Sequence, residues 1–208
     1  MNFFKRIFQK GSSSAKSITT EAISSNINFA DFTANDEDAK ILPVLKNRLE
    51  LDLQKKRGMF VDELFPSSNE NSPLVMYGKD RGICIEYSPS KSSESDLTTK
   101  EEAINNLKNI EIPFEINNES ELCFSIIQHE YAAEKILDKN FMKVLANELS
   151  ADELTVGIPM KGVMVAAPKE AAQALVKMTE SIYDSGENDP ISKSLFLVSS
   201  GEIIAMTA

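Results

Sequence analysis

The chain has 208 residues and a formal net charge of −10, with 42% hydrophobic and 26% charged residues. This length suffices for one domain with a substantial core, and the composition excludes a fibrous or wholly disordered chain. No apolar stretch approaches the roughly 18 residues of a transmembrane helix, so we expect a cytoplasmic protein.

The charge is unevenly distributed along the chain. Residues 1–16 contain four basic and no acidic residues, which gives them a charge of +4 and leaves −14 on the rest. A folded domain with this negative charge repels the phosphate backbone of nucleic acids, so we expect no nucleic-acid partner.

The N-terminal tip, residues 1–11, combines large apolar side chains with basic ones. On a helix, four apolar residues would share one face, namely Phe3, Phe4, Ile7 and Phe8. The basic residues would lie beside or opposite that face, namely Lys5, Arg6 and Lys10. Three interpretations stay open for the tip: contact with an anionic membrane surface, contact with a protein partner or a second copy, or no role.

A polar segment rich in Ser, Thr and Asn follows the tip, and it is typical of a linker or a loosely packed lead-in. We therefore divide the chain into a tip with its linker, residues 1–38, and one α+β domain, residues 39–208. Within the domain, residues 41–45 predict an edge strand because Pro43 lacks a backbone N–H. Strands at 74–77 and 83–87 predict a hairpin that turns through residues 78–82.

Three further strand pairs and three helices alternate along the remaining chain. The strand pairs are predicted at 113–116 with 122–127, 153–158 with 163–166, and 195–198 with 203–206. Helices are predicted from Thr98, where Thr98 and Thr99 offer capping boxes, over residues 130–149, and from Pro168. This pattern predicts an α+β fold, an antiparallel or mixed sheet of hairpins interleaved with three main helices packed over it.

The order and spacing of several strings resemble the YtpQ-like proteins, a bacterial family of uncharacterised function. The matching strings lie at residues 41–46, 74–87, 97–107, 131–137, 153–159, 163–165 and 190–196, and together they cover roughly residues 40–200. Gly162 and Ala132 stand where the family pattern has acidic residues. These departures weaken a catalytic assignment of the turn that ends at Gly162. The resemblance implies the fold and supplies no activity.

Residues that could carry chemistry are few. His129, the only histidine, is interpreted as a capping or surface residue, because no second histidine or cysteine stands at metal-ligand spacing. Cys84 and Cys123 lie in apolar runs and are expected to pack in the core, although a single disulfide stays possible. Residues 78–82 are interpreted as a turn rather than a phosphate loop. We therefore predict no catalytic, cofactor-binding or metal-binding residue.

The sequence favours a non-catalytic binding or regulatory module that acts through protein contacts, either with a partner or by self-association. One alternative is a hydrolase or transferase that uses carboxylates. Another is a peripheral protein held at the inner face of the membrane through residues 1–11. A pocket lined by carboxylates with perturbed pKa values would favour the enzyme, whereas an exposed sheet edge would favour binding.

Overall fold

A computed structural model of the chain describes residues 39–50, 54–55, 57–66, 72–82, 84–119, 122–185 and 189–207. All of these residues belong to one compact unit, Glu37–Ala208. The predictions on the N-terminal tip and its linker concern residues 1–38, which lie outside the described residues.

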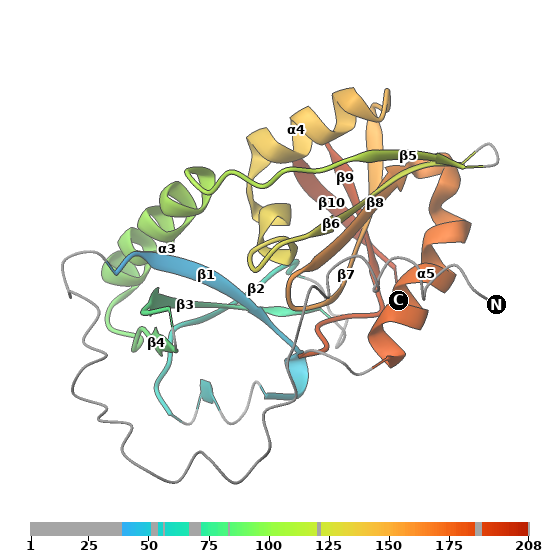
Figure 1. Cartoon of the computed structure of the whole chain (residues 1–208). Coiled ribbons are helices and arrows are strands. Elements are labelled where there is room, and N and C mark those ends of the chain that lie inside the picture. Colours follow the sequence, from blue (N-terminus) through green and yellow to red (C-terminus); the bar gives the residue numbers. More distant parts are fainter. Residues whose placement is uncertain are drawn as a thin grey trace, which may run out of the picture. The chain divides into compact units, whose positions relative to one another are not determined.

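The first four strands form a small antiparallel sheet (Figure 1). They are β1 (Ile41–Lys46), β2 (Val61–Glu63), β3 (Leu74–Asp80) and β4 (Ile85–Tyr87). The order is β1-β3-β2, and β4 also pairs with β3. A short 3₁₀ helix, η2 (Arg48–Glu50), follows β1. The predicted edge strand with Pro43 is therefore confirmed.

The other six strands form a larger sheet in the order β10-β9-β7-β8-β6-β5, with every neighbouring pair antiparallel. Their bounds are β5 (Ile116–Glu119), β6 (Leu122–Gln128), β7 (Glu153–Met160), β8 (Val163–Pro168), β9 (Leu195–Ser199) and β10 (Glu202–Met206). The three predicted hairpins are present, each made of strands adjacent in both sequence and sheet, but the strand predicted at 113–116 lies at 116–119 instead.

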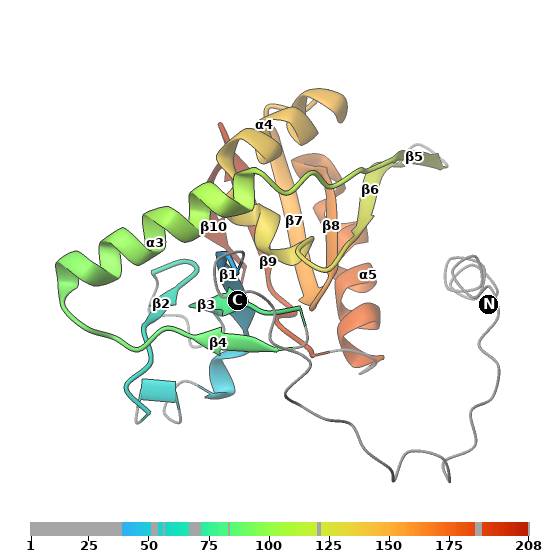
Figure 2. The same cartoon turned by 60° about the vertical axis from the view of Figure 1, so that its left-hand side comes forward.

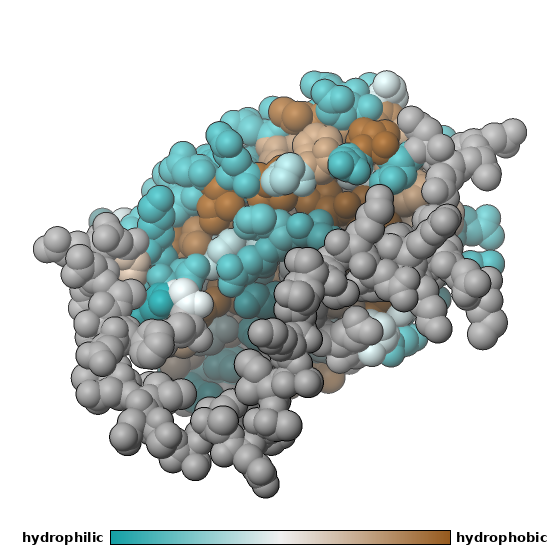
Figure 3. Space-filling view, viewed as in Figure 1, coloured by the Kyte–Doolittle hydropathy of each residue, from teal (hydrophilic) through white to brown (hydrophobic). Residues whose placement is uncertain are grey.

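Three main helices pack over the strands, which confirms the predicted α+β fold. They are α3 (Ser93–Lys108), α4 (Lys139–Glu148) and α5 (Ala172–Asp184), with short 3₁₀ helices η3 (Ala133–Leu137) and η4 (Lys169–Ala171) before the last two. Figure 2 places α5 on one side of the large sheet and α3, η3 and α4 on the other. Hydrophilic residues cover the outer face of α3, and apolar residues gather between it and the large sheet (Figure 3).

Helix α3 begins at Ser93, five residues before the predicted start at Thr98. The reason is the hydroxyl of Ser92, which accepts a hydrogen bond from the backbone N–H of Ser95 and so caps the helix. The hydroxyls of Thr98 and Thr99 donate to backbone carbonyls one turn earlier, within the helix. The predicted capping boxes are therefore wrong.

The predicted helix over residues 130–149 is divided at Asp138. This residue has an extended backbone conformation, and its carboxylate accepts hydrogen bonds from the backbone N–H groups of Asn140 and Phe141. It thereby caps the N-terminus of α4, and the chain before it forms only the 3₁₀ helix η3. The single helix predicted over residues 130–149 is therefore wrong, because Asp138 ends η3 and begins α4.

A buried ion pair joins three of these elements. Lys135 in η3 is 2% exposed, and its Nζ donates to the carbonyl oxygen of Leu107 at the end of α3, at 2.9 Å, and to Oδ2 of Asp138, at 2.8 Å. The ammonium also lies 5.4 Å from the ring centroid of Phe141. The pair therefore connects the C-terminus of α3 with the N-terminus of α4.

The predicted turn at residues 78–82 is shorter than expected, because β3 continues through Asp80 and pairs with β4. Gly78 lies inside the strand, where an added Cβ would come within 2.6 Å of the side chain of Ile85 and 2.8 Å of the carbonyl oxygen of Glu86. The glycine thus permits the close approach of β4 rather than forming a turn.

Both cysteines are free thiols, and only one fits the expected core position. Cys123 is half-buried and packs against the larger core cluster, but Cys84 is exposed in the turn before β4. The core assignment of Cys84 is therefore wrong. Within the described part of the chain, no helix has both the length and the apolar character needed to cross a membrane.

Candidate functional site

A cavity of about 250 Å³ lies where the small sheet meets loops of the large sheet. Its charged residues come from four separate segments: Lys46 at the end of β1, Asp80 at the end of β3, Glu130 after β6, and Lys161 in the β7–β8 turn. The other described lining residues are uncharged, namely Val44, Gly82, Cys84, Ile85 and Tyr87.

The carboxylate of Asp80 is held by two donors. The hydroxyl of Tyr131 donates to Oδ2, and the backbone N–H of Gly82 donates to Oδ1 at 2.7 Å. Burial of Tyr131, followed by its hydrogen bond to Asp80, raises the pKa of the phenol above its ordinary value. The hydroxyl therefore keeps its proton at neutral pH and fixes the orientation of the carboxylate.

The two lysines of the cavity each have an acidic partner. Nζ of Lys161 lies 3.8 Å from Oε1 of Glu130, and Nζ of Lys46 lies 3.2 Å from Oδ2 of Asp189. Both pairs are partly exposed to solvent, where an ion pair contributes about 0–1 kcal/mol. The lysines can therefore exchange these partners at a small cost.

Glu134 in η3 is 1% exposed and lies against β1. Its Oε1 accepts a hydrogen bond from the backbone N–H of Leu45 at 3.1 Å, and its Oε2 is buried without a hydrogen-bond partner among the described residues. Burial raises the pKa of this carboxyl to about 7, although the N–H of Leu45 and the charges of Lys161 and Lys46 oppose the shift.

The turns beside the cavity are tied together by their backbones. The N–H of His129 donates to the carbonyl oxygen of Gly162 at 3.1 Å, and Gly162 has a φ of +77°, which favours glycine. Nδ1 of His129 accepts from the N–H of Tyr131 at 3.2 Å, within the turn that precedes η3, whose N-cap is Ala132. These bonds place Lys161 beside Glu130.

Sequence reasoning missed this group of residues, because they come from segments far apart in the chain. One signal was available: Glu134 and Lys135 interrupt the apolar run of residues 131–136, and charged residues in such a run are buried only with partners. Among the described residues, no group of three or more His, Cys, Asp or Glu side chains could hold a metal ion.

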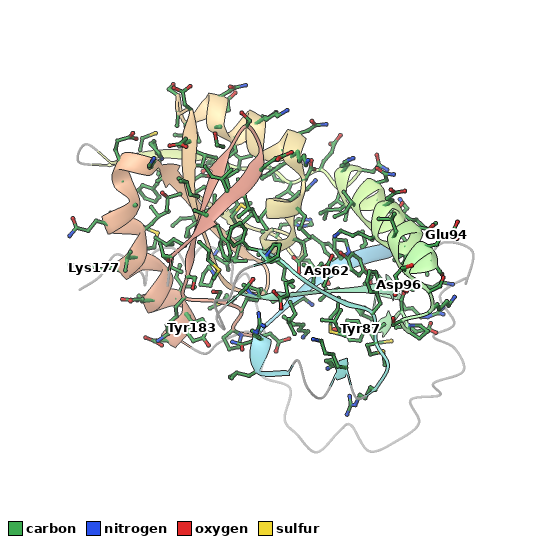
Figure 4. All side chains as sticks on the ribbon, turned by 180° about the vertical axis from the view of Figure 1, so that it is seen from behind. Asp62, Tyr87, Glu94, Asp96, Lys177 and Tyr183 are labelled. Carbon is green, nitrogen blue, oxygen red and sulfur yellow. The ribbon has the colours of Figure 1, made fainter. Side chains whose placement is uncertain are left out.

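A second feature of functional interest is the edge strand β10. Its Ile204 is 47% exposed, and its pairing with β9 is interrupted by a bulge between Ile203 and Ala205. No described strand pairs with its outer side, and no hydrogen bond to that side comes from the described residues. The view from behind shows the two C-terminal strands on the near side of the large sheet (Figure 4).

Comparison with known proteins adds no assignment to this geometry. No family model matches the chain, and neither the curated proteins nor the solved structures that were searched contain a match. The resemblance to the YtpQ-like family therefore stays a prediction.

Proposed function

We propose that the chain is a non-catalytic binding module of a bacterial cytoplasm and acts through protein contacts, with β10 as its contact edge. The observation that supports this proposal is the outer side of β10, where Ile204 is exposed and where none of the described strands pairs. An edge strand offers a row of backbone N–H and C=O groups that another extended chain can bind.

The residue types of β10 suit such pairing. Residues 203–206 are all apolar and contain neither Pro nor Lys, the residues that commonly protect an edge. The opposite edge strand of the same sheet, β5, is mostly polar, with Asn117, Asn118 and Glu119. The bulge at Ile204 limits the ladder to a short segment, so we expect weak, concentration-dependent association.

A second copy of this chain is the partner that we propose. If two β10 strands pair in antiparallel fashion around Ile204, Glu202 of each copy lies opposite Met206 of the other. The two copies of Glu202 are thereby kept apart, and residues 203–205 of each copy face apolar residues of the other. Such an interface is isologous, so two-fold symmetry closes it at the dimer.

Sedimentation velocity over a range of protein concentrations tests the proposal. The wild-type chain should show a reversible monomer–dimer equilibrium, and Ile204→Lys should shift it to monomer by placing a charge on the edge. Val176→Lys is the matched control, because Val176 is also exposed and apolar but lies on α5. A wild-type chain that stays monomeric throughout, or equal loss of dimer in both variants, would contradict the proposal.

A second candidate function is a hydrolase or transferase that uses carboxylates. It is favoured by one observation: Asp80 and Glu130 line the same cavity although they are 50 positions apart in the chain. Hydrolysis of chromogenic ester, phosphate and glycoside substrates by the wild-type chain, lost in both Asp80→Asn and Glu130→Gln, would support the enzyme. Turnover that survives in both variants would contradict the assignment to these carboxylates.

A further inference from the structure

One carboxylate in the cavity between β1, the β3–β4 hairpin and the β7–β8 turn has no basic partner among the described residues. The other charged lining residues all belong to ion pairs, namely Lys46 with Asp189, and Glu130 with Lys161. Asp80 accepts hydrogen bonds from the hydroxyl of Tyr131 and the N–H of Gly82, and no described lysine or arginine pairs with it. A carboxylate has about four acceptor positions, so Asp80 can accept further donors.

The nearest neighbours of Asp80 on the small sheet are apolar and aromatic. In the register of β3 with β4, Asp80 lies opposite Ile85, and Gly78 lies opposite Tyr87. Since alternate residues of a strand share a face, the side chains of Asp80, Ile85 and Tyr87 lie on the same face, and all three line the cavity. Asp80 and Tyr87 are diagonal neighbours, which lie about 7–8 Å apart in a sheet, within reach of an aromatic side chain. One small group can therefore contact both the carboxylate and the ring.

The basic residues near Asp80 in the chain do not neutralise it. Lys79 precedes Asp80 in the strand, so its side chain points to the opposite face. Arg81 forms an ion pair with Glu86, which lies opposite Lys79 on β4. The register of β1 with β3 places Lys46 at the other end of β3, about 20 Å along the strand. A positive group at Asp80 is therefore not opposed by an adjacent, unpaired cation among the described residues.

The electrostatic surroundings of Asp80 favour a positive ligand. Burial and the hydrogen bond to Asp80 raise the pKa of Tyr131, and the negative charges of Asp80, Glu130 and Glu134 raise it further. Negative charge therefore prevails around the hydroxyl that orients Asp80. Residues 17–208 also carry a net charge of −14, which attracts cations to the domain from a distance.

The size and the walls of the cavity restrict the cation to a small organic one. About 250 Å³ is below the usual 300–1,000 Å³ of sites for drug-sized molecules. Val44, Ile85 and Tyr87 give the cavity an apolar wall that a short hydrocarbon chain can contact. The face of a tyrosine ring also attracts an ammonium group that lies within about 6 Å of its centroid. A bare metal ion would gain nothing from this wall, and no described group of three His, Cys, Asp or Glu side chains could hold one.

We propose that this cavity binds a primary ammonium group on a short hydrocarbon arm. The ammonium lies between the carboxylate of Asp80 and the ring of Tyr87, and the arm packs against the apolar wall. The ammonium donates charge-assisted hydrogen bonds to a carboxylate that is already oriented, and both ion pairs of the cavity stay intact. Free alkylamines and the lysine side chains of proteins both carry such a group. The site does not involve β10, so this proposal and the proposed dimer can fail independently.

Titrations of the full chain followed by NMR provide the first test, with sodium chloride keeping the ionic strength constant. We expect n-butylammonium to cause saturable shifts in the amide resonance of Gly82, which donates to Asp80. The neutral analogue n-butanol should bind at least about tenfold more weakly. Lysine blocked as its Nα-acetyl methylamide tests the second source of the ammonium, and the same compound acetylated at Nε is its neutral control.

The outcomes of these titrations are distinct. Binding of n-butylammonium alone supports a free amine as the ligand, and binding of blocked lysine, with or without n-butylammonium, supports a lysine side chain. If neither cation causes saturable shifts, the proposal is wrong. It is also wrong if the neutral analogues bind as tightly as the cations, because the carboxylate would then contribute nothing.

Variants then locate the site. Asp80→Asn keeps the size of the side chain and removes its charge, so it should weaken binding of n-butylammonium about tenfold or more. Asp152→Asn is the matched control, because Asp152 also has no basic partner among the described residues but does not line this cavity. Tyr87→Leu should weaken binding about two- to fivefold, and it serves even if Asp80→Asn perturbs folding through Tyr131. Equal affinity in Asp80→Asn and Asp152→Asn, or unchanged affinity in Tyr87→Leu, would overturn the assignment.

Discussion

Strands β1 and β10 both lie at the edge of a sheet, but their outward-facing backbone groups have different partners. On β1, the carbonyl oxygen of Ile41 accepts from the side-chain amide of Asn106 at 3.0 Å, and the N–H of Leu45 donates to Glu134 at 3.1 Å. Pro43, between them, has no N–H to offer. On β10, no hydrogen bond from a described residue reaches the outer side.

The difference shows that other parts of the fold can bind the outward-facing backbone groups of an edge strand, which closes the edge, or can leave the edge open. Closing β1 requires a buried carboxyl, Glu134, whose second oxygen has no hydrogen-bond partner among the described residues. It also requires that η3 be held in place, which the buried pair of Lys135 and Asp138 does. An edge that is closed by such an arrangement serves the fold, whereas β10 has no such closure among the described residues and is the edge that we propose for contact with another chain.

The residues that hold η3 under β1 should give the largest effect. Lys135→Met removes the ammonium and leaves the carboxylate of Asp138 buried and unpaired, so we expect a loss of about 3–5 kcal/mol in the free energy of unfolding, measured by urea denaturation. Lys139→Met is the matched control, because it breaks an exposed pair with Glu202 and should lose at most about 1 kcal/mol. Similar losses in both variants would show that the buried pair does not hold η3.

The stability of the folded chain should depend on pH through the carboxyl of Glu134, which closes the edge of β1. The pKa of this carboxyl is about 7 in the folded chain and 4.5 at its ordinary value, so between these pH values the folded state binds more protons than the unfolded state. The free energy of unfolding therefore falls as the pH rises from 4.5 to 7. Glu134→Gln removes this dependence, so the variant should gain about 3 kcal/mol relative to wild type between pH 4.5 and pH 7. Urea denaturation at several pH values measures the difference. A constant difference across the window would show that the carboxyl does not titrate there.

The turn that leads into β10 should be the next most sensitive position. Gly201 has a φ of +80°, and an added Cβ would come within 2.4 Å of the carbonyl oxygen of Lys139. Gly201→Ala should therefore lower the melting temperature and cost about 2–3 kcal/mol. Gly58→Ala is the matched control, since Gly58 has a φ of +69° with open space around it, and it should cost about 1 kcal/mol. Equal costs would mean that the backbone at Gly201 can shift without penalty.

Deleting residues 1–11 should have the smallest effect on stability. We expect the free energy of unfolding to stay within about 1 kcal/mol of the full chain, because the tip is predicted to direct location rather than folding. If the tip contacts membranes, flotation with anionic vesicles at low salt should recover the full chain and not the truncated one. Unfolding of the truncated chain would place the tip in the core. Loss of the dimer on truncation would show that the tip, rather than β10, makes the protein contact.

Much of the local structure could be predicted from the sequence. Short apolar runs on either side of turn residues predicted the four hairpins, and Pro43 marked β1 as an edge strand. These features depend on residues close together in the chain, so periodicity and turn residues are enough to find them. The errors at this level were boundaries: Ser92 caps α3 in place of Thr98 or Thr99, and Asp138 begins α4 inside the helix predicted over residues 130–149.

The composition and local pattern by themselves determined the α+β class, the antiparallel pairing of neighbours and the three main helices. Only the tertiary structure decided that the strands divide into two sheets, that Cys84 is exposed, and that Glu134 closes the edge of β1. Glu134 and Leu45 are 89 positions apart in the chain, and the partner of a buried charge depends on which distant backbone group the fold brings to it. The cavity has the same origin, because its four charged residues come from four segments that only the packing of the two sheets brings together.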